Sequence, residues 1–477
     1  MLSTFSLSIF CFSINLDCQK NQYICKKDTD MKKKFYYLLI LAFLTFFIPA
    51  CSNSDEEPKV ENEEQTDSEE EKGNEEEKKE WEDDGMSNNP RKYITLSRAE
   101  EELAALNTDF AFRYLQVSNE ALASNGNMLL SPQSASFALS MLGNGAAGKT
   151  QDEILDVLGF NKFTLDEMNE YNQKLMNELG GLDNTTTMNF ANSLWMDDVF
   201  NVLGDYKQVM KDAYQAEVNV LDFNQSSAKD KINQWCSDKT NGRIPHFLDE
   251  WNPDVKAMLI NALYFKGKWY SQFKKDKTEE GSFTTASGES ENVDYMRQTV
   301  NFQYIKNEKV SVVEFPYGNY AFRMYVVLPH EGVSLDEWIK DLSAAQWETM
   351  LNDMKAQWLD IWLPKFRIEW KDAITGILEK MGMQKAFDKE EADFSSLSDE
   401  HFFVYDILQA TYLNVDEGGT EGAAVTGNTD ITADLEDDKD QEKKVVEFRA
   451  NHPFLFIIQE ESTGSVLFLG KFVGTDN

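Results

Sequence analysis

Histidine and cysteine are the scarcest residues in this chain, which has four histidines and five cysteines among 477 residues. The histidines are His246, His330, His401 and His452, and no two of them have the spacing of metal ligands. The chain also lacks the G-x-S-x-G elbow of serine hydrolases. We therefore expect no metal site, no cofactor and no enzymatic activity.

Positive charge is also in deficit, because 46 Lys and Arg residues stand against 83 Asp and Glu residues and give a formal net charge of −37. Nucleic-acid binding needs a basic surface, so this class of function is excluded. The acidity favours solubility and repels anionic surfaces. Hydrophobic residues still make up 42% of the chain, which is enough for a large core.

The N-terminal region is predicted to be a processing signal. Met31 is followed by three lysines and an apolar run over 35–48, and these fourteen residues are too few to span a bilayer but typical of a signal-peptide core. We interpret residues 1–30 as a mis-called start and 31–50 as a lipoprotein signal peptide. Of the cysteines at 11, 18, 25, 51 and 236, two then remain, so no disulfide framework is expected and Cys236 is predicted to be a buried free thiol.

The apolar run ends in the sequence IPAC at 48–51, which resembles a bacterial lipobox with Cys51 as the acylated residue. A multi-chain lipid anchor of this kind holds a protein stably on a membrane. Residues 51–91 are then an acidic tether, since 52–86 contain seventeen Asp and Glu against four Lys and too little apolar surface to fold. This acidic run after the cysteine resembles the surface-export signal of some Gram-negative lipoproteins, and a plain solvated spacer is the alternative. We expect a lipid-anchored protein of the bacterial envelope, in the outer membrane and facing the surface or the extracellular side.

The remaining residues, 92–477, are predicted to form one α+β domain. Apolar spacing between Leu103 and Leu115 indicates an amphipathic helix, and Ser131-Pro132 opens a helix over 134–142. Strands are expected at 310–315, 321–328, 358–363, 402–408, 445–448, 454–459 and 465–473. Helices mainly in the first half and strands mainly in the second indicate large antiparallel sheets with a helical N-terminal half.

The segment Val415–Gly427, VDEGGTEGAAVTG, is rich in small residues and free of proline. With the two-residue period of a strand, one face carries Thr420, Gly422, Ala424 and Thr426. None of these is charged or bulky, so this face can enter a sheet at little desolvation cost. Glu421 lies on the opposite face and is expected to stay in water. The segment therefore indicates a strand that is exposed in one state and inserted in another, with a flexible linker as the alternative.

Seven residues of this segment match the hinge pattern of the serpin family: Glu417, Gly419, Thr420, Glu421, Gly422, Ala423 and Ala424. Further matches follow in the family's order, at 127–154, 259–269 (LINALYFKGKW), 313–319 (VEFPYGN), 362–398, 448–456 (FRANHPFLF) and 465–473 (SVLFLGKFV). From Leu96 to Val473 the chain thus resembles a serpin. The resemblance implies a serpin-like single domain with an exposed reactive loop at about 417–446.

The resemblance also implies roles for particular residues. The hinge would comprise Glu417, Gly419, Thr420, Glu421, Gly422, Ala423, Ala424, Val425 and Thr426. The shutter, where the main sheet opens, would comprise Ser131, Ser134, Asn261 and Gln409, with Gln409 standing where the family usually has a histidine. Trp269 would mark the breach at the top of the sheet, where insertion begins.

The implied activity is irreversible, suicide-type inhibition of serine, or alternatively cysteine, proteases, by a monomer whose cleaved loop inserts into its own sheet. Family spacing counted from Glu417 places the reactive bond at Ala433–Asp434, which would suit an elastase-like protease. Leu435 would instead suit a chymotrypsin-like or subtilisin-like protease, and Lys439 a trypsin-like one.

Two other interpretations stay open. One is a serpin-fold protein without inhibitory activity that binds a partner at the cell surface. The other comes from GNGAAGKT at 143–150, a match to the phosphate-binding P-loop in which Lys149 would reach the phosphates of a nucleotide. A P-loop must follow a strand, whereas this stretch follows a helical pattern, so we interpret it as a turn between two helices.

Overall fold

The computed structural model describes residues 89–122, 126–252, 255–421 and 444–475. Its helices are α3 (Arg98–Ala121), α4 (Pro132–Gly145), α5 (Gly148–Leu158), α6 (Leu165–Glu178), α7 (Gly204–Tyr214), α8 (Ser227–Lys239), α9 (Leu335–Asp341), α10 (Ala344–Asp353) and α11 (Thr375–Met381), with short 3-10 turns at Leu179–Gly181, Lys275–Lys277 and Lys385–Phe387. Within the described residues, no helix is long and apolar enough to cross a membrane.

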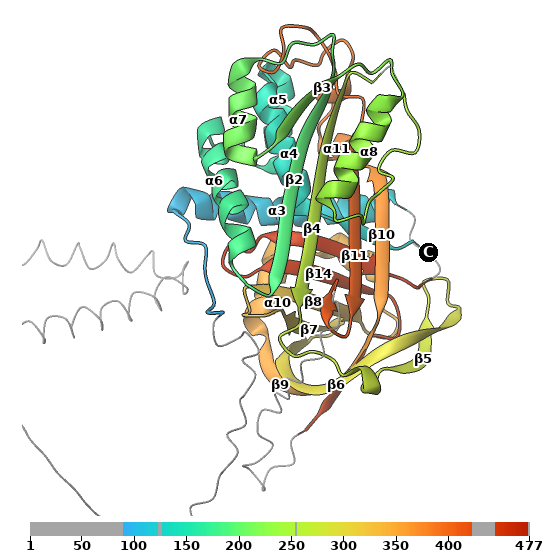
Figure 1. Ribbon diagram of the computed structural model, residues 1–477. Coiled ribbons are helices and arrows are strands. Elements are labelled where there is room, and N and C mark those ends of the chain that lie inside the picture. The colour runs from blue at the N-terminus through green and yellow to red at the C-terminus, as the bar shows by residue number, and fades with distance from the viewer. Residues whose placement is uncertain (1–88, 123–125, 253–254, 422–443, 476–477) are drawn as a thin grey trace, which may run out of the picture. The chain divides into compact units, whose positions relative to one another are not determined.

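Two sheets contain all of the described strands (Figure 1). The nine-stranded sheet has the order β1-β15-β14-β8-β7-β6-β9-β13, with β5 paired to β6. Its strands are β1 (Met128–Leu130), β5 (Glu279–Thr284), β6 (Ser290–Lys306), β7 (Val310–Pro316), β8 (Phe322–Pro329), β9 (Lys355–Pro364), β13 (Val446–Arg449), β14 (Phe454–Glu460) and β15 (Val466–Phe472).

The six-stranded sheet has the order β10-β11-β12-β4-β2-β3. Its strands are β2 (Thr186–Asp197), β3 (Glu217–Leu221), β4 (Ala257–Lys268), β10 (Phe366–Ala373), β11 (Ile407–Asp416) and β12 (Gly419–Thr420). Most strand pairs are antiparallel, but β2 with β3, β11 with β4, and β13 with β9 are parallel. The predicted α+β architecture is confirmed, with mixed rather than purely antiparallel sheets.

The helices begin where the sequence supplies caps. Ser97 accepts a hydrogen bond from the amide of Glu100, and the Glu100 carboxylate accepts one from the amide of Ser97, which makes a capping box at the start of α3. One face of α3, which includes Leu103 and Phe110, is buried. Thr164 and Glu167 form the same box at the start of α6.

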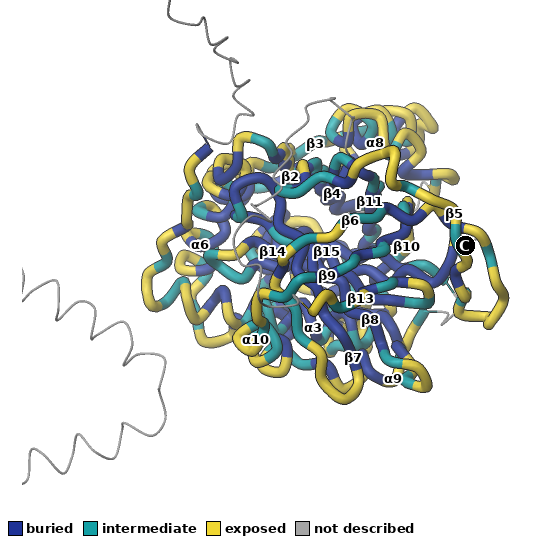
Figure 2. The backbone as a smooth tube through the Cα atoms, turned by 90° about the horizontal axis from the view of Figure 1, so that it is seen from below, coloured by how far each residue is buried: buried dark blue, intermediate teal, exposed yellow. Residues whose placement is uncertain are grey.

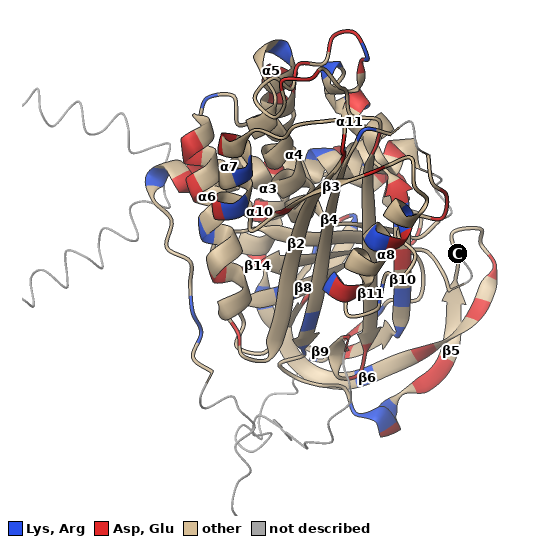
Figure 3. Ribbon diagram, turned by 45° about the horizontal axis from the view of Figure 1, so that its top comes forward, with Lys and Arg blue, Asp and Glu red and all other residues tan. Residues whose placement is uncertain are grey.

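The core lies between the sheets and the helices, and every residue of β14 and β15 is buried. Figure 2 shows the buried strands at the centre and the exposed residues on outer helices and loops. On the face of the six-stranded sheet that is turned away from the main core, Ile232 of α8 packs into a smaller apolar cluster with Trp195 of β2 and Ile260 of β4. Charged residues are gathered on the helices and on β5 and β6, whereas β2 and β4 carry few of them (Figure 3).

The predicted strand at 402–408 is wrong over most of its length, because β11 begins at Ile407 and 401–406 are irregular. Phe402 lies outside the sheet and stacks on Phe394, with ring centroids 5.1 Å apart. It also packs against Phe200 in a T-shaped arrangement, with ring centroids 5.5 Å apart. Aromatic packing outside the sheet therefore accounts for the apolar residues that the pattern assigned to a strand.

Candidate functional site at the hinge and shutter

The hinge residues begin directly after β11, and two of them already lie in the sheet. The chain turns at Glu417 and Gly418 and forms β12, which pairs antiparallel with β11 (Val415 with Thr420) and with β4 (Gly267 with Thr420). The amide of Trp269 donates to Gly418 O at 3.1 Å. The structure therefore places the hinge positions Gly419 and Thr420 between β11 and β4, the two strands that a further inserted strand would separate.

Thr420 is fully buried at this point. Its Oγ1 lies 2.5 Å from the hydroxyl of Tyr317, whose ring stacks on Trp269 with centroids 4.5 Å apart. Trp269 in turn donates its indole N–H to Asp416 O at 2.9 Å. Burial raises the pKa of Tyr317 above its ordinary range, so its hydroxyl stays protonated and can hydrogen-bond to Thr420. The rings of Tyr317 and Trp269 therefore lie next to the hinge and support it at Thr420.

Two glycines allow the strands to approach closely here. Gly419 has a φ of +146°, and a Cβ on it would clash with the carbonyl oxygen of Gly267. A Cβ on Gly267 would lie 2.8 Å from the ring of Tyr317. A side chain at Gly419 would therefore require the backbone of β4 to shift, and one at Gly267 would require the ring of Tyr317 to move.

Glu417 holds the turn that precedes β12. Its carboxylate accepts a hydrogen bond from the Thr278 hydroxyl at 2.8 Å and lies 3.3 Å from Lys365 Nζ. Burial opposes ionisation, but the backbone amide, Thr278 and Lys365 together hold the pKa of Glu417 below its ordinary value. The carboxylate is therefore charged at neutral pH and fixes the point at which the chain enters the sheet.

The expectation that Glu421 stays in water is wrong, because its side chain is 1% exposed. Glu421 does leave the face occupied by Thr420, with a φ of +54°. The connection from α8 to β4 covers that face, however, and brings Arg243 Nε to 3.2 Å from the Glu421 carboxylate. The Arg243 guanidinium also lies over the ring of Tyr412, 5.4 Å from its centroid. Glu421 is thus an ion-paired, covered residue that directly follows β12.

The structure brings together two of the predicted shutter residues, Ser131 and Gln409. The Gln409 amide accepts from the Ser131 amide N–H and donates to the Ser131 carbonyl, both at 3.0 Å. It also accepts from the Tyr114 hydroxyl at 3.3 Å, and the Ser131 hydroxyl donates to Leu467 O at 2.9 Å. An amide can make this reciprocal pair because it carries both a donor and an acceptor. The strand β11 is therefore tied to the start of α4.

The other two shutter residues are placed differently. Asn261 donates to the side chain of Asn192 on β2, while its backbone lies in register with that of Gln409 on the parallel β11–β4 pair. The hydroxyl of Ser134 is buried and has no hydrogen-bond partner among the described residues. Asn261 is thus close to Gln409 through the backbone, and Ser134 takes no part in the described hydrogen bonds.

Between shutter and hinge, β11 and β4 lie in the sheet without a described pairing to each other. They pair directly only from Ile407–Gln409 to Leu259–Asn261, and β12 joins them again at Val415 and Gly267. The five intervening residues on each strand, 410–414 and 262–266, define what we call the insertion slot. Extended in the register of β12, the chain would place Thr426 opposite both Gln409 and Asn261.

Several predicted site residues lie outside the described part of the chain. These are Cys51, the hinge residues Gly422, Ala423, Ala424, Val425 and Thr426, the reactive bond Ala433–Asp434 and the alternatives Leu435 and Lys439. The glycine-rich stretch at 143–150 is described, and it joins α4 to α5 rather than following a strand. The predicted turn between helices is therefore confirmed. Cys236 is a buried free thiol as predicted, and burial raises its pKa to about 12.

The order of the strands and the position of the hinge between β11 and β4 define the class of protein to which the chain belongs. Residues 105–475 match the family model described as "Serpin (serine protease inhibitor)". An uncharacterized serpin-like protein from Methanosarcina mazei is 32% identical over 379 residues, which cover 78% of this chain and 87% of that protein. Leukocyte elastase inhibitor from Xenopus laevis is 31% identical over 384 residues, covering 78% and 99%. The chain belongs to the serpin family.

Solved structures agree with this assignment. The thermophilic serpin tengpin in its native state is similar with a TM-score of 0.72 at 29% identity, over 82% of this chain and 98% of that chain. Thyroxine-binding globulin in complex with thyroxine is similar with a TM-score of 0.71 at 28% identity, over 79% and 100%. The family thus contains proteins named as inhibitors and one named for binding a small molecule.

Proposed function

We propose that this protein is an irreversible, suicide-type inhibitor of serine proteases, with cysteine proteases as a further target class. The observation that carries the proposal is the position of β12: Thr420 already lies between β11 and β4, and the insertion slot continues directly ahead of it. A hinge in this position can continue into the sheet without a change of register.

The steps follow from this geometry. A target protease attacks the carbonyl carbon of Ala433, forms an acyl bond to it and releases the amine of Asp434. The severed hinge then extends β12 through the slot, and beyond Thr426 it must break the pairing of Gln409 with Asn261. The native state is held by that kinetic barrier, and insertion must outrun hydrolysis of the acyl bond. The proposed target has an elastase-like or subtilisin-like pocket.

The experiment is to mix the full chain with elastase, chymotrypsin, trypsin, subtilisin and papain and to separate the products on denaturing gels. A band at the summed mass of protein and protease, stable to denaturant, is the expected result. The mass of the released C-terminal peptide identifies the bond among Ala433, Leu435 and Lys439. Cleavage by every protease without such a band would contradict the proposal.

A second candidate function is partner binding without inhibition. It is favoured by the similarity to thyroxine-binding globulin, a protein of this fold that is named for a molecule that it binds. In that case cleavage would leave the unfolding midpoint almost unchanged, whereas full insertion would raise it because the sheet gains a strand.

We also propose that the protein is a monomer held on the bacterial outer membrane through acylated Cys51, with the acidic tether of residues 51–91 separating the domain from the lipid. Incorporation of labelled palmitate by the wild type, and its loss in Cys51→Ser, tests the anchor. Release of the domain by protease added to intact cells tests the surface location.

A further inference from the structure

A hollow of about 470 Å³ lies between the turn that joins β6 to β7 and the helices α9 and α10. This volume falls within the range of pockets that bind small molecules. Its apolar lining residues are Trp338, Leu342 and Met350, and its charged lining residues are Glu308, Lys309 and Asp341. The hollow therefore combines an apolar surface with charged groups, and it shares none of these residues with the hinge or the shutter.

The walls of the hollow are held in place by the rest of the protein. Trp338 and Leu342 are 8% and 2% exposed and belong to the main core, and Met350 packs against that core. On the opposite wall, Asn307 Oδ1 accepts a hydrogen bond from the amide of Lys309 at 2.8 Å and fixes the turn. Asn307 Nδ2 lies 3.8 Å from Met350 Sδ and so joins the turn to α10. The hollow is therefore preformed, and a ligand would not have to order its walls on binding.

The charged groups that line the hollow leave an excess of negative charge. Lys309 Nζ and the Asp341 carboxylate lie 3.9 Å apart, and both side chains are mostly exposed. The Glu308 carboxylate has no ion pair among the described residues. Two carboxylates against one ammonium group leave one negative charge uncompensated. Because an exposed ion pair is weak, Asp341 can also interact with a competing cation.

We propose that this hollow binds a small organic amine, a cation with a compact apolar body. The indole of Trp338 and the thioether of Met350 suit such a body, because an indole attracts cations and methionine adapts to irregular apolar shapes. Glu308 and Asp341 would balance the charge of the amine. An anion of the same shape would meet two carboxylates with a single lysine to offset them. This inference does not depend on inhibition of a protease.

The test compares three probes that share one apolar body and differ in charge: 4-phenylbutylamine, 4-phenylbutanol and 4-phenylbutyrate. Each is titrated to about 20 mM into the full chain at neutral pH and physiological salt, and tryptophan fluorescence is recorded. Salt at this concentration screens the general attraction of a cation to an acidic protein. For the amine we expect saturation with a dissociation constant of about 1 mM. The alcohol should bind at least about threefold more weakly and the acid more weakly still.

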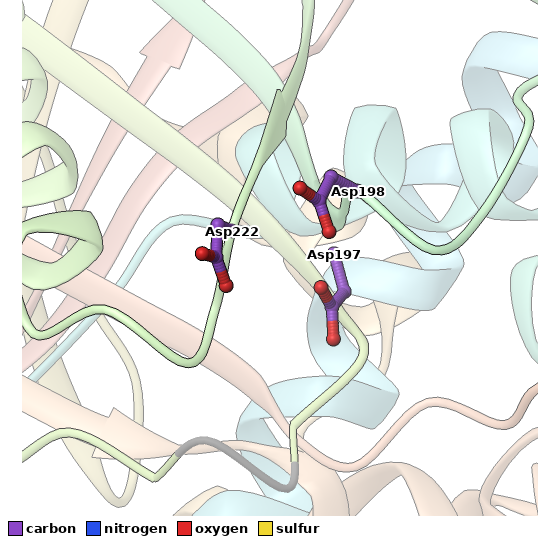
Figure 4. A group of neighbouring side chains, drawn as sticks. All are labelled: Asp197, Asp198 and Asp222. Carbon is purple, nitrogen blue, oxygen red and sulfur yellow. The ribbon is translucent and has the colours of Figure 1, made fainter.

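Two double variants separate the hollow from acidity elsewhere. Glu308→Gln combined with Asp341→Asn should lower the affinity for the amine to that for the alcohol. Asp198→Asn combined with Asp222→Asn is the matched control, because it removes the same formal charge from a different acidic group. Figure 4 shows that group, in which Asp198 and Asp222 lie close to Asp197 at the ends of β2 and β3. None of these three aspartates lines the hollow, so the control should bind the amine as the wild type does.

A third variant tests whether the apolar body occupies the hollow. Thr349 is an exposed residue of α10 that lines it, so Thr349→Trp fills space there without changing any charge. This variant should weaken binding of the amine and of the alcohol by the same factor. Absence of saturation with the amine, equal affinity for the amine and the acid, or equal loss of binding in the two double variants would overturn the proposal. Unchanged binding by Thr349→Trp would overturn the location.

Discussion

The substitution Thr420→Arg tests loop insertion most directly, since it places a charge at the first fully buried hinge position. The described neighbours of Thr420 are the hydroxyl of Tyr317 and the backbone of Gly267, and neither carries a charge that could pair with the introduced guanidinium. Burying an unpaired charge costs several kcal/mol even after relaxation. If about 3 kcal/mol of this cost enters the barrier to insertion, insertion slows roughly 150-fold.

Hydrolysis of the acyl bond does not slow with it, so the variant should be turned over as a substrate. The assay is the number of inhibitor molecules consumed per protease molecule inactivated, which should rise from the order of one to tens or more. Thr420→Ser is the control, because it keeps the hydroxyl bonded to Tyr317 and should trap as the wild type does. A denaturant-stable complex of Thr420→Arg at wild-type yield would refute insertion at this position.

Substitutions at Gln409, Arg243 and Glu417 test the contacts around the hinge and the shutter. Gln409→Ala removes the buried hydrogen bonds to Ser131, at a cost of about 1–3 kcal/mol. The half-life of the native state on mild heating should therefore shorten. An unchanged half-life would show that this contact does not hold the sheet closed. Gln409→His should make that half-life shorten as the pH falls below about 6.5, a step absent from the wild type. Arg243→Ala leaves the buried Glu421 carboxylate without its ion pair, so limited proteolysis at the hinge should accelerate. Adding Glu421→Gln to this variant should restore protection. Equal cleavage in all variants would contradict the role of the ion pair. The pKa of Glu417 is lowered from its ordinary 4.5, so the carboxylate contributes its full stabilisation above pH 4.5 and loses it as the pH falls through the lowered pKa. The unfolding midpoints of the wild type and Glu417→Gln should therefore converge in acid. Parallel pH profiles of the two midpoints would disprove this.

Much of the fold could be predicted from local patterns. The amphipathic spacing of Leu103 to Leu115 and the Ser131-Pro132 start signal fall within α3 and α4. The strand-like runs predicted at 310–315 and 321–328 likewise correspond to β7 and β8, which are buried over almost their whole length. These signals succeed because each helix or strand displays in its own residues the apolar pattern that it buries.

The site could be predicted only in part, because its decisive contacts are between distant segments. A two-residue period assigns Glu421 to the face opposite Thr420, but it cannot show that Arg243, 178 residues earlier, covers that face. Tyr317 lies in the VEFPYGN segment, yet nothing local marks its hydroxyl as the partner of Thr420. Partial insertion of β12 is likewise a property of strand order, which no local pattern encodes.

The insertion slot also has a consequence for how the native protein is lost over time. The amide of Glu421 already bonds to Asn414 O, but no pairing of β11 with β4 is described in the rest of the slot. A strand with small, uncharged side chains could enter there, and the loop of a second copy meets that description as well as the protein's own. Uptake of a molecule's own loop is first order, with a half-life independent of protein concentration. Uptake from another molecule is second order, so the native lifetime would shorten in proportion as the protein is concentrated.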